Sequence, residues 1–123
     1  RLVADTGVGM LVVTHDLGLA WNIADRVAVM YLGRIVEQGT TEQVLTEPRH
    51  PYTRALLSVV PEVAEMEQQI LRGETPDPLN IPAGCRFHPR CPLVESGEAA
   101  RLGIEERCRG DDPLMLPACH AVA

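Results

Sequence analysis

The run Met10-Leu11-Val12-Val13-Thr14, followed directly by His15 and Asp16, decides the fold class of this 123-residue chain. A continuous apolar run of this kind is typical of a strand that is buried on both faces, as in a parallel sheet. Apolar residues then recur at helical spacing at Leu17, Ala20, Trp21 and Ala24. Asp16 is placed to cap that helix. We therefore predict an α/β fold and expect Trp21 to lie in its core.

Two β-rich runs come next, at residues 26–31 and 34–38. The pair Leu32-Gly33 separates them, which predicts a β-hairpin. Thr40 or Thr41 is placed to cap a short helix with an acidic residue in its first turn. Local signals therefore predict a helix, a hairpin and a second helix after the first apolar run.

A further helix is predicted after Pro51, because proline suits the first position of a helix. Its apolar residues form one stripe at Tyr52, Ala55, Leu56, Val59 and Val60. We expect Pro61 to end this helix and His50 to be a capping or surface group. Residues 73–84 are rich in proline and glycine and predict an extended linker.

Composition excludes several classes of function. All eleven positive charges are arginine, so the chain has neither a Schiff-base lysine nor the lysine of a phosphate-binding loop. The net charge of −6 argues against nucleic acid as a partner, because such binding needs a basic face. No apolar run approaches the ~18–20 residues that span a bilayer. A role at a membrane would therefore depend on a protein partner.

His15 is the first candidate site residue. It stands between the predicted strand and the helix that follows it. In open α/β sheets, ligands bind beyond the carboxyl ends of the strands, where a histidine can hydrogen-bond a phosphate oxygen or a bound water. The alternative interpretation is a loop histidine that merely helps to cap the helix.

The cysteines are the second candidate site, and all four lie near the C-terminus: Cys85, Cys91, Cys108 and Cys119. Two disulfides in a secreted protein and a metal or cluster site in a cytosolic one are both compatible with this number. The spacing contains no Cys-x₂-Cys pair, so a zinc ribbon is poorly supported. Four thiolates on a loop-rich segment can hold an iron–sulfur cluster. The remaining interpretation is four cysteines that are free or partly disulfide-bonded and only pack.

Residues next to the four cysteines add to the interpretation of this second candidate site. Phe87 is placed to shield it, and His88 and His120 are alternative ligands for zinc. Arginines flank the cysteines at Arg86, Arg90, Arg107 and Arg109. We expect their positive charge to favour thiolates and to offset the charge of an anionic cluster.

Two stretches in the first third of the chain are LVVTHDLGLA at 11–20 and IADRVAVMYLGRIVEQG at 23–39. Together they resemble the end of an ABC transporter ATPase domain. The resemblance places His15 at the switch-loop histidine of that family. It implies that this side chain contacts the γ-phosphate and helps to position the attacking water.

Later segments resemble the oligopeptide and dipeptide subgroup of that family. They are HPYTRALL at 50–57, CRFHPRCP at 85–92, Cys108, Pro113-Leu114 and Cys119-His120. The resemblance implies the C-terminal part of the ATP-binding subunit of a peptide importer. Some members of the subgroup carry a [4Fe–4S] cluster, which makes the four cysteines its expected ligands, with zinc as the less favoured metal.

Three regions are expected on this basis. Residues 1–47 are the end of the ATPase domain, with switch-loop strand, helix, hairpin and short helix. Residues 48–77 are a linking helical region, and residues 78–123 are a small irregular Pro/Cys-rich appendage. The phosphate-binding loop, Q-loop, signature motif and Walker B carboxylates cannot be placed in this chain. We therefore expect a fragment that is no enzyme alone, from a parent ATPase that uses ATP and Mg²⁺.

The resemblance also implies partners and a location. The partners are a second ATPase subunit or domain, membrane permease subunits and, indirectly, an extracytoplasmic peptide-binding protein. The location is peripheral, at the cytoplasmic face of the cell membrane. The alternative function is a stand-alone metal- or iron–sulfur-binding interaction module without ATPase activity.

Overall fold

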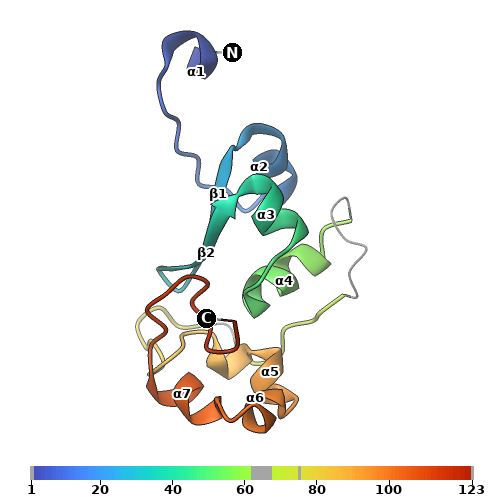
Figure 1. Cartoon of the computed structure of the whole chain (residues 1–123), viewed down its shortest axis with the longest axis vertical. Helices are drawn as coiled ribbons and strands as arrows, with labels where there is room; N and C mark the ends of the chain where they lie inside the picture. Colours follow the sequence, from blue (N-terminus) through green and yellow to red (C-terminus); the bar gives the residue numbers. More distant parts are fainter. Residues whose placement is uncertain (1, 62–67, 75, 123) are drawn as a thin grey trace.

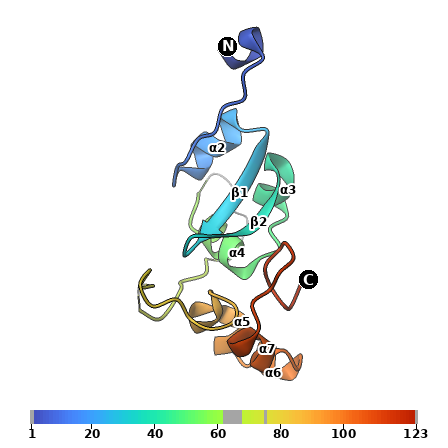
Figure 2. The ribbon, with the colours of Figure 1, turned by 90° about the vertical axis from the view of Figure 1, so that its left-hand side faces the viewer.

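The computed structural model describes residues 2–61, 68–74 and 76–122. Its elements, in chain order, are α1 (Leu2–Thr6), α2 (Leu17–Ile23), β1 (Arg26–Tyr31), β2 (Arg34–Thr40), α3 (Thr41–Thr46), α4 (Pro51–Ser58), the 3₁₀-helix η1 (His88–Arg90), α5 (Pro92–Glu95), α6 (Glu98–Arg101) and α7 (Glu105–Gly110). An arm carrying α1 projects from a body built by α2, the two strands, α3 and α4 (Figure 1). Helices α5 to α7 gather at the opposite end, and Figure 2 shows the same separation from the side. The described fold is thus mixed α/β, as predicted.

The two strands form the predicted hairpin. They pair antiparallel from Arg26 opposite Thr40 to Tyr31 opposite Arg34, with a bulge between Val29 and Met30. The connecting residues Leu32 and Gly33 both have positive φ, 48° and 74°. Two-residue turns with this backbone match the right-handed twist of the strands they join. The turn therefore fixes the register of the hairpin.

Local capping chemistry explains where the helices begin. The Asp16 carboxylate accepts a hydrogen bond from the Leu19 amide at 2.9 Å, which confirms it as the cap of α2. Thr40 caps α3 in a reciprocal capping box with Gln43, which satisfies two backbone donors at once. Pro51 is the first residue of α4, as predicted.

The prediction for the end of α4 is wrong by a few residues. The helix ends at Ser58, so Val59 and Val60 lie beyond it, and Val59 is exposed. The Ser58 hydroxyl donates to the Ala55 carbonyl and accepts from the Gln69 amide. These hydrogen bonds of the Ser58 side chain stabilise the last turn of α4, where the helix ends.

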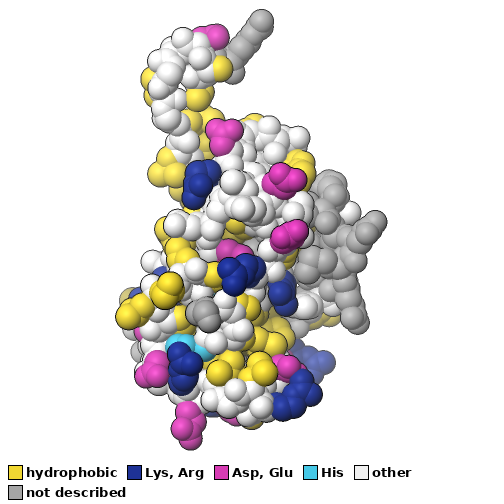
Figure 3. Space-filling view, viewed as in Figure 1, with side chains coloured by type: hydrophobic (Ala, Val, Ile, Leu, Met, Phe, Trp, Pro, Cys, Tyr) yellow, Lys and Arg dark blue, Asp and Glu magenta, His cyan; other side chains and the backbone are white. Residues whose placement is uncertain are grey.

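The prediction of a buried strand at Met10–Thr14 is also wrong for this structure. These residues form neither strand nor helix, and Leu11 and Val13 are 93% and 94% exposed. Figure 3 shows hydrophobic side chains along this arm. A strand buried on both faces needs neighbouring strands, and the sheet of the described residues contains β1 and β2 alone. Trp21, expected in the core, is 45% exposed for the same reason: nothing described here covers its face of α2.

The core lies between the hairpin, α3, α4 and the cysteine-containing segment. Its centre is an aromatic cluster in which Tyr31 stands 4.6 Å from Tyr52 and 5.2 Å from Phe87, between ring centroids. Phe87 is 1% exposed and Leu57 is fully buried. Aromatic rings carry a large buried area each. The cluster therefore joins β1, α4 and the segment before η1 into one packed unit.

The connection between α4 and η1 has little regular structure. Residues 68–74 and 76–84 form neither helix nor strand, in agreement with the predicted linker at 73–84. Of the predicted linking region 48–77, residues 62–67 and 75 lie outside the described part of the chain. Over the described ranges, no helix has both the length and the hydropathy needed to span a bilayer.

Candidate functional site

The four cysteines come from four different places and line one cavity. Cys85 lies before η1, Cys91 precedes α5, Cys108 lies in α7 and Cys119 belongs to the C-terminal turn. Each is a buried, free thiol with less than a tenth of its surface exposed. Three histidines line the same cavity: His50, His88 and His120.

Backbone hydrogen bonds hold these segments in place. The Cys85 amide donates to the Cys108 carbonyl at 2.9 Å, which ties the segment before η1 to α7. The His88 amide donates to the Cys85 carbonyl at 3.0 Å, and the His88 ring approaches the same oxygen at 2.8 Å. The Ala118 amide donates to the Val36 carbonyl at 2.7 Å and so fastens the C-terminal turn to β2.

Burial sets the protonation state of the thiols. It raises the pKa of Cys85 and of Cys91 to about 11, and it also raises the pKa of Cys108 and of Cys119. Arg107 and Arg109 act on Cys108 in the opposite direction, but desolvation is larger. Arg107 and Arg109 therefore favour the thiolate of Cys108, as expected, but burial outweighs their effect, and the thiols are protonated at neutral pH.

The cysteine sulfurs of this site are suitable metal ligands, but the geometry of the cavity does not fit a metal cluster. Four cysteine sulfurs are the soft ligands that iron–sulfur clusters and zinc take. The cavity, however, measures about 10 Å³, the lower limit for a single water molecule. Across residues 2–61, 68–74 and 76–122, no three His, Cys, Asp or Glu side chains are grouped to hold a metal ion. The arrangement does not fit a cluster, and the metal-ligand role of the cysteines stays a prediction.

The raised pKa values predict slow thiol chemistry in the folded chain. Alkylation of Cys85 and Cys91 by iodoacetamide at mildly alkaline pH should be at least about a hundredfold slower than in the urea-unfolded chain. A pKa of about 11 in place of 9.0 leaves about a hundredth of the thiolate. The free energy of unfolding should also fall as pH rises from about 9 to about 11, since the unfolded chain loses these protons first. Peptide mass spectrometry and urea titrations at several pH values measure both effects. Equal alkylation rates in the two states would contradict the buried arrangement.

His50 lines the cavity as a structural residue. It is 1% exposed, and its Nδ1 accepts the Tyr52 amide at 3.0 Å as the cap of α4. Because Nδ1 is an acceptor, the proton lies on Nε2, which donates to the Ala118 carbonyl at 3.2 Å. Burial lowers the pKa of His50 to about 4, so the ring is neutral at physiological pH. The capping interpretation is confirmed, and the surface alternative is wrong.

Glu37 is a buried carboxylate that the sequence analysis did not single out. It is 4% exposed on β2, and it accepts the backbone amides of Arg49 and His50 at 2.8 and 3.0 Å. Buried charges are tolerated when they are hydrogen-bonded in this way. Glu37 therefore holds the chain before α4 at a fixed position. Its place in a β-rich run, directly after Ile35 and Val36, was the available signal.

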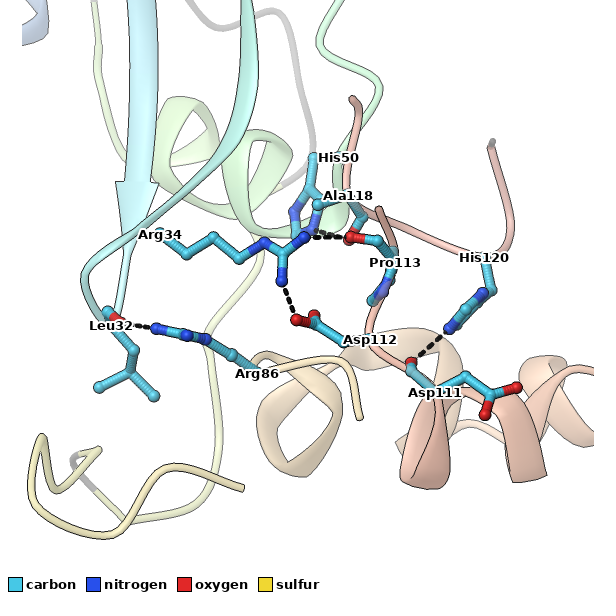
Figure 4. A network of polar contacts seen from close by, with 9 residues as sticks. All are labelled: Leu32, Arg34, His50, Arg86, Asp111, Asp112, Pro113, Ala118 and His120. Carbon is cyan, nitrogen blue, oxygen red and sulfur yellow. Dashed lines mark hydrogen bonds and ion pairs between the residues drawn. The ribbon is translucent and has the colours of Figure 1, made fainter. Parts of the chain in front are cut away.

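Two arginines connect the hairpin to the C-terminal half (Figure 4). Arg34 forms an ion pair with Asp112 and donates to the Pro113 carbonyl. Arg86 donates from Nη1 to the Leu32 carbonyl at 2.6 Å. In the same view the His120 ring approaches the Asp111 carbonyl, with 2.7 Å between Nε2 and the oxygen. The bonds of Arg34 and Arg86 span more than 50 residues of sequence and could not be read from local patterns.

His15 lies apart from the cysteine cavity, of whose described lining it is not a member. It is exposed and directly precedes Asp16, the cap of α2. The Asp16 amide in turn donates to the Thr14 hydroxyl at 3.0 Å. This loop fixes the backbone on both sides of His15 and leaves its side chain open to a partner. The catalytic role of His15 stays a prediction.

Comparison with known protein families identifies the family of this chain. The family described as the oligopeptide/dipeptide transporter C-terminal region matches residues 36–97, which are 62 of the 123 residues. The chain belongs to this family. The matched residues run from β2 through the end of α5 to the residue before α6, and they include Cys85 and Cys91. The oligopeptide/dipeptide transporter C-terminal region thus covers both the buried Glu37–His50 contact and the first half of the cysteine cavity.

Curated relatives extend the match over most of the chain. The dipeptide transport ATP-binding protein DppF of Escherichia coli is 48% identical over 98% of this chain. DppF of Haemophilus influenzae is 49% identical over 89% of it. These matches cover 36% and 31% of the two relatives. The chain therefore spans about a third of the length of the curated relatives it matches.

Proposed function

We propose that this chain is the C-terminal part of the ATP-hydrolysing subunit of a peptide importer. The observation that carries the proposal is the identity of almost half of all positions with dipeptide transport ATP-binding proteins, over nearly the whole chain. The complete subunit binds MgATP, mostly through residues outside this chain. Residues 1–47 complete its ATPase domain, and residues 78–123 form the appendage joined by the linking region 48–77.

Within this proposal His15 is the chain's catalytic contribution. A histidine on a loop of fixed backbone can hydrogen-bond the γ-phosphate and orient the attacking water. The exposure of His15 and the capped helix behind it support this assignment. The ligands of Mg²⁺ and the general base come from other parts of the subunit, because neither a phosphate-binding loop nor the Walker B carboxylates can be placed in this chain.

The proposed partners follow from the same relationship. The subunit pairs with a second ATPase subunit or domain and acts on membrane permease subunits, with an extracytoplasmic binding protein delivering the peptide. It is peripheral at the cytoplasmic face of the membrane. The exposed apolar arm and Trp21 support a packed neighbour on this side of the chain, supplied by the rest of the ATPase domain.

The deciding experiment is transport by the complete subunit. We expect vesicles that contain it with its permease to import a labelled dipeptide only when MgATP is present on the subunit's side. A dipeptide with the binding protein on the opposite side should raise the rate of ATP hydrolysis. A rate of ATP hydrolysis that does not change when the dipeptide is added would refute peptide import. A reading frame without Walker A and signature motifs upstream of Arg1 would favour the stand-alone binding module.

The isolated chain should bind no MgATP in a saturable manner. The backbone amides and the lysine that cradle the β- and γ-phosphates are supplied elsewhere in such enzymes. Isothermal titration calorimetry of the 123-residue chain with MgATP measures this directly. Micromolar affinity with unit stoichiometry would show that the chain carries a nucleotide site of its own.

A further inference from the structure

A second pocket, separate from the cysteine cavity, opens between the hairpin turn and residues 74 and 76–90. Its volume is about 480 Å³, within the range of small-molecule sites. The hairpin contributes Tyr31 and Leu32, and the opposite wall contributes Arg86 and Arg90 together with three prolines. The pocket therefore combines aromatic and proline surfaces with two guanidinium groups.

Arg86 is held in place by the hairpin turn. Its Nη1 donates to the Leu32 carbonyl at 2.6 Å (Figure 4). Leu32 has φ of 48°, an unusual value for a residue with a side chain. The turn thus fixes one nitrogen of the guanidinium, and the remaining donors of Arg86 are available to another acceptor.

Arg90 has one buried donor without an acceptor. Its Nε is buried, and no hydrogen-bond acceptor reaches it among the residues the structure describes. The guanidinium lies close enough to Tyr52 to oppose the effects of burial and Tyr31, which raise the pKa of that hydroxyl. Buried donors in folded proteins almost always have a partner. Arg90 therefore carries a positive charge that the described chain leaves incompletely satisfied.

Neither arginine has an acidic partner within ion-pair distance in the described ranges, whereas four other arginines do: Arg34, Arg72, Arg101 and Arg109. Two acids also line the pocket, Glu74 and Asp77. Both oxygens of Asp77 are already engaged, by the Leu79 amide at 2.9 Å and the Asn80 amide group at 2.6 Å. Glu74 is therefore the acid of the pocket lining whose carboxylate is available to a bound ligand.

We propose that this pocket binds a small molecule through a compact oxyanion, a carboxylate or a phosphate, held by Arg86 and Arg90. Planar guanidinium groups match both oxyanions with paired hydrogen bonds. The ring of Tyr31 and the prolines receive the apolar part of the ligand. The lining of this pocket shares no residue with the lining of the cysteine cavity.

The test follows the Arg90 Nε–H and the Leu32 and Gly33 amide signals of the ¹⁵N-labelled 123-residue chain by NMR. The chain is titrated with inorganic phosphate and, separately, with the zwitterionic dipeptide alanyl-alanine. We expect saturable shifts of these signals with at least one of the two probes. Arg86→Gln and Arg90→Gln should each weaken binding at least about tenfold, as expected for a lost hydrogen bond to a charged group.

Matched variants separate the outcomes. Arg26→Gln removes the same charge at the far, exposed end of β1 and should leave binding unchanged. Arg90→Lys keeps the charge without the planar fork, and it replaces Arg90→Gln should that variant not fold. Glu74→Gln should strengthen phosphate binding but weaken dipeptide binding, which distinguishes a simple anion from a ligand that also carries an ammonium group. The proposal is overturned if neither probe shifts the signals, or if Arg26→Gln weakens binding as much as the pocket variants.

Discussion

Replacing His15 by alanine in the complete subunit should lower the turnover number for ATP by about 10²- to 10⁴-fold, the range for a lost group that acts on the reacting atoms. The dissociation constant for MgATP should change little. A side chain that contacts the γ-phosphate and the attacking water acts mainly in the transition state, so its loss appears in kcat. Steady-state hydrolysis and equilibrium nucleotide binding measure the two quantities separately.

The neighbouring residue supplies the control for this prediction. Asp16→Ala removes the cap of α2 and its bond from the Leu19 amide, at a cost of about 1 kcal/mol in stability. It leaves the His15 imidazole in the chain, so turnover should fall only a few-fold. If His15→Ala turned over ATP as fast as the wild type, or no more slowly than Asp16→Ala, His15 would be a loop residue that supports the helix cap.

The parts of the fold that the sequence predicted correctly depend on neighbours in the chain. The cap at Asp16, the capping box at Thr40 and the proline that begins α4 each involve groups a few residues apart. The hairpin turn at Leu32-Gly33 is equally local. Such features are decided by backbone donors and acceptors that no distant segment has to supply. A sequence pattern is therefore sufficient to locate them.

Features that depend on distant neighbours were predicted poorly. The apolar run at Met10–Thr14 carries the pattern of a buried strand, but burial requires partner strands, and none lies beside it in the described residues. Trp21 is exposed for the same reason. Conversely, His50 is fully buried because its ring reaches Ala118, 68 residues away. Hydrophobic pattern gives the tendency to be buried but does not say which segment covers the residue.

The same distinction between local and distant neighbours applies to the candidate site. The four thiols line one cavity, but their role as metal ligands stays a prediction. Arg107 and Arg109 oppose the rise in the pKa of Cys108, but the sulfurs are desolvated, and desolvation dominates the pKa of each thiol. The pocket with Arg86 and Arg90 was missed because its opposite wall is the hairpin turn, more than 50 residues earlier. Because the hairpin turn and the linker lie far apart in the sequence, no local pattern predicted the pocket that they form.

Gly84→Ala should destabilise the chain by about 3–5 kcal/mol, from overpacking together with a lost hydrogen bond. A Cβ at this position would stand 2.6 Å from the Cys108 carbonyl oxygen and from the Arg109 carbonyl carbon. Both atoms belong to the backbone of α7, which cannot move aside as a side chain would. The Cys85 amide, one residue on, donates to the same Cys108 oxygen. The added methyl group therefore has to break this bond and separate the segment before η1 from α7.

Gly97→Ala is the matched control, because it isolates the close contact from the backbone conformation. Gly84 and Gly97 have similar positive φ values, 71° and 80°, but a Cβ on Gly97 would meet nothing within 4 Å. Its cost should be the conformational strain alone, about 1–2 kcal/mol. Urea unfolding measures both free energies, and the difference between the variants is the contribution of the contact with α7. Faster alkylation of Cys85 and Cys108 in Gly84→Ala, but not in Gly97→Ala, would locate the damage at the cysteine cavity. Equal destabilisation by the two variants would mean that α7 does not pack against Gly84, and the cavity that joins the four thiols would lose its structural basis.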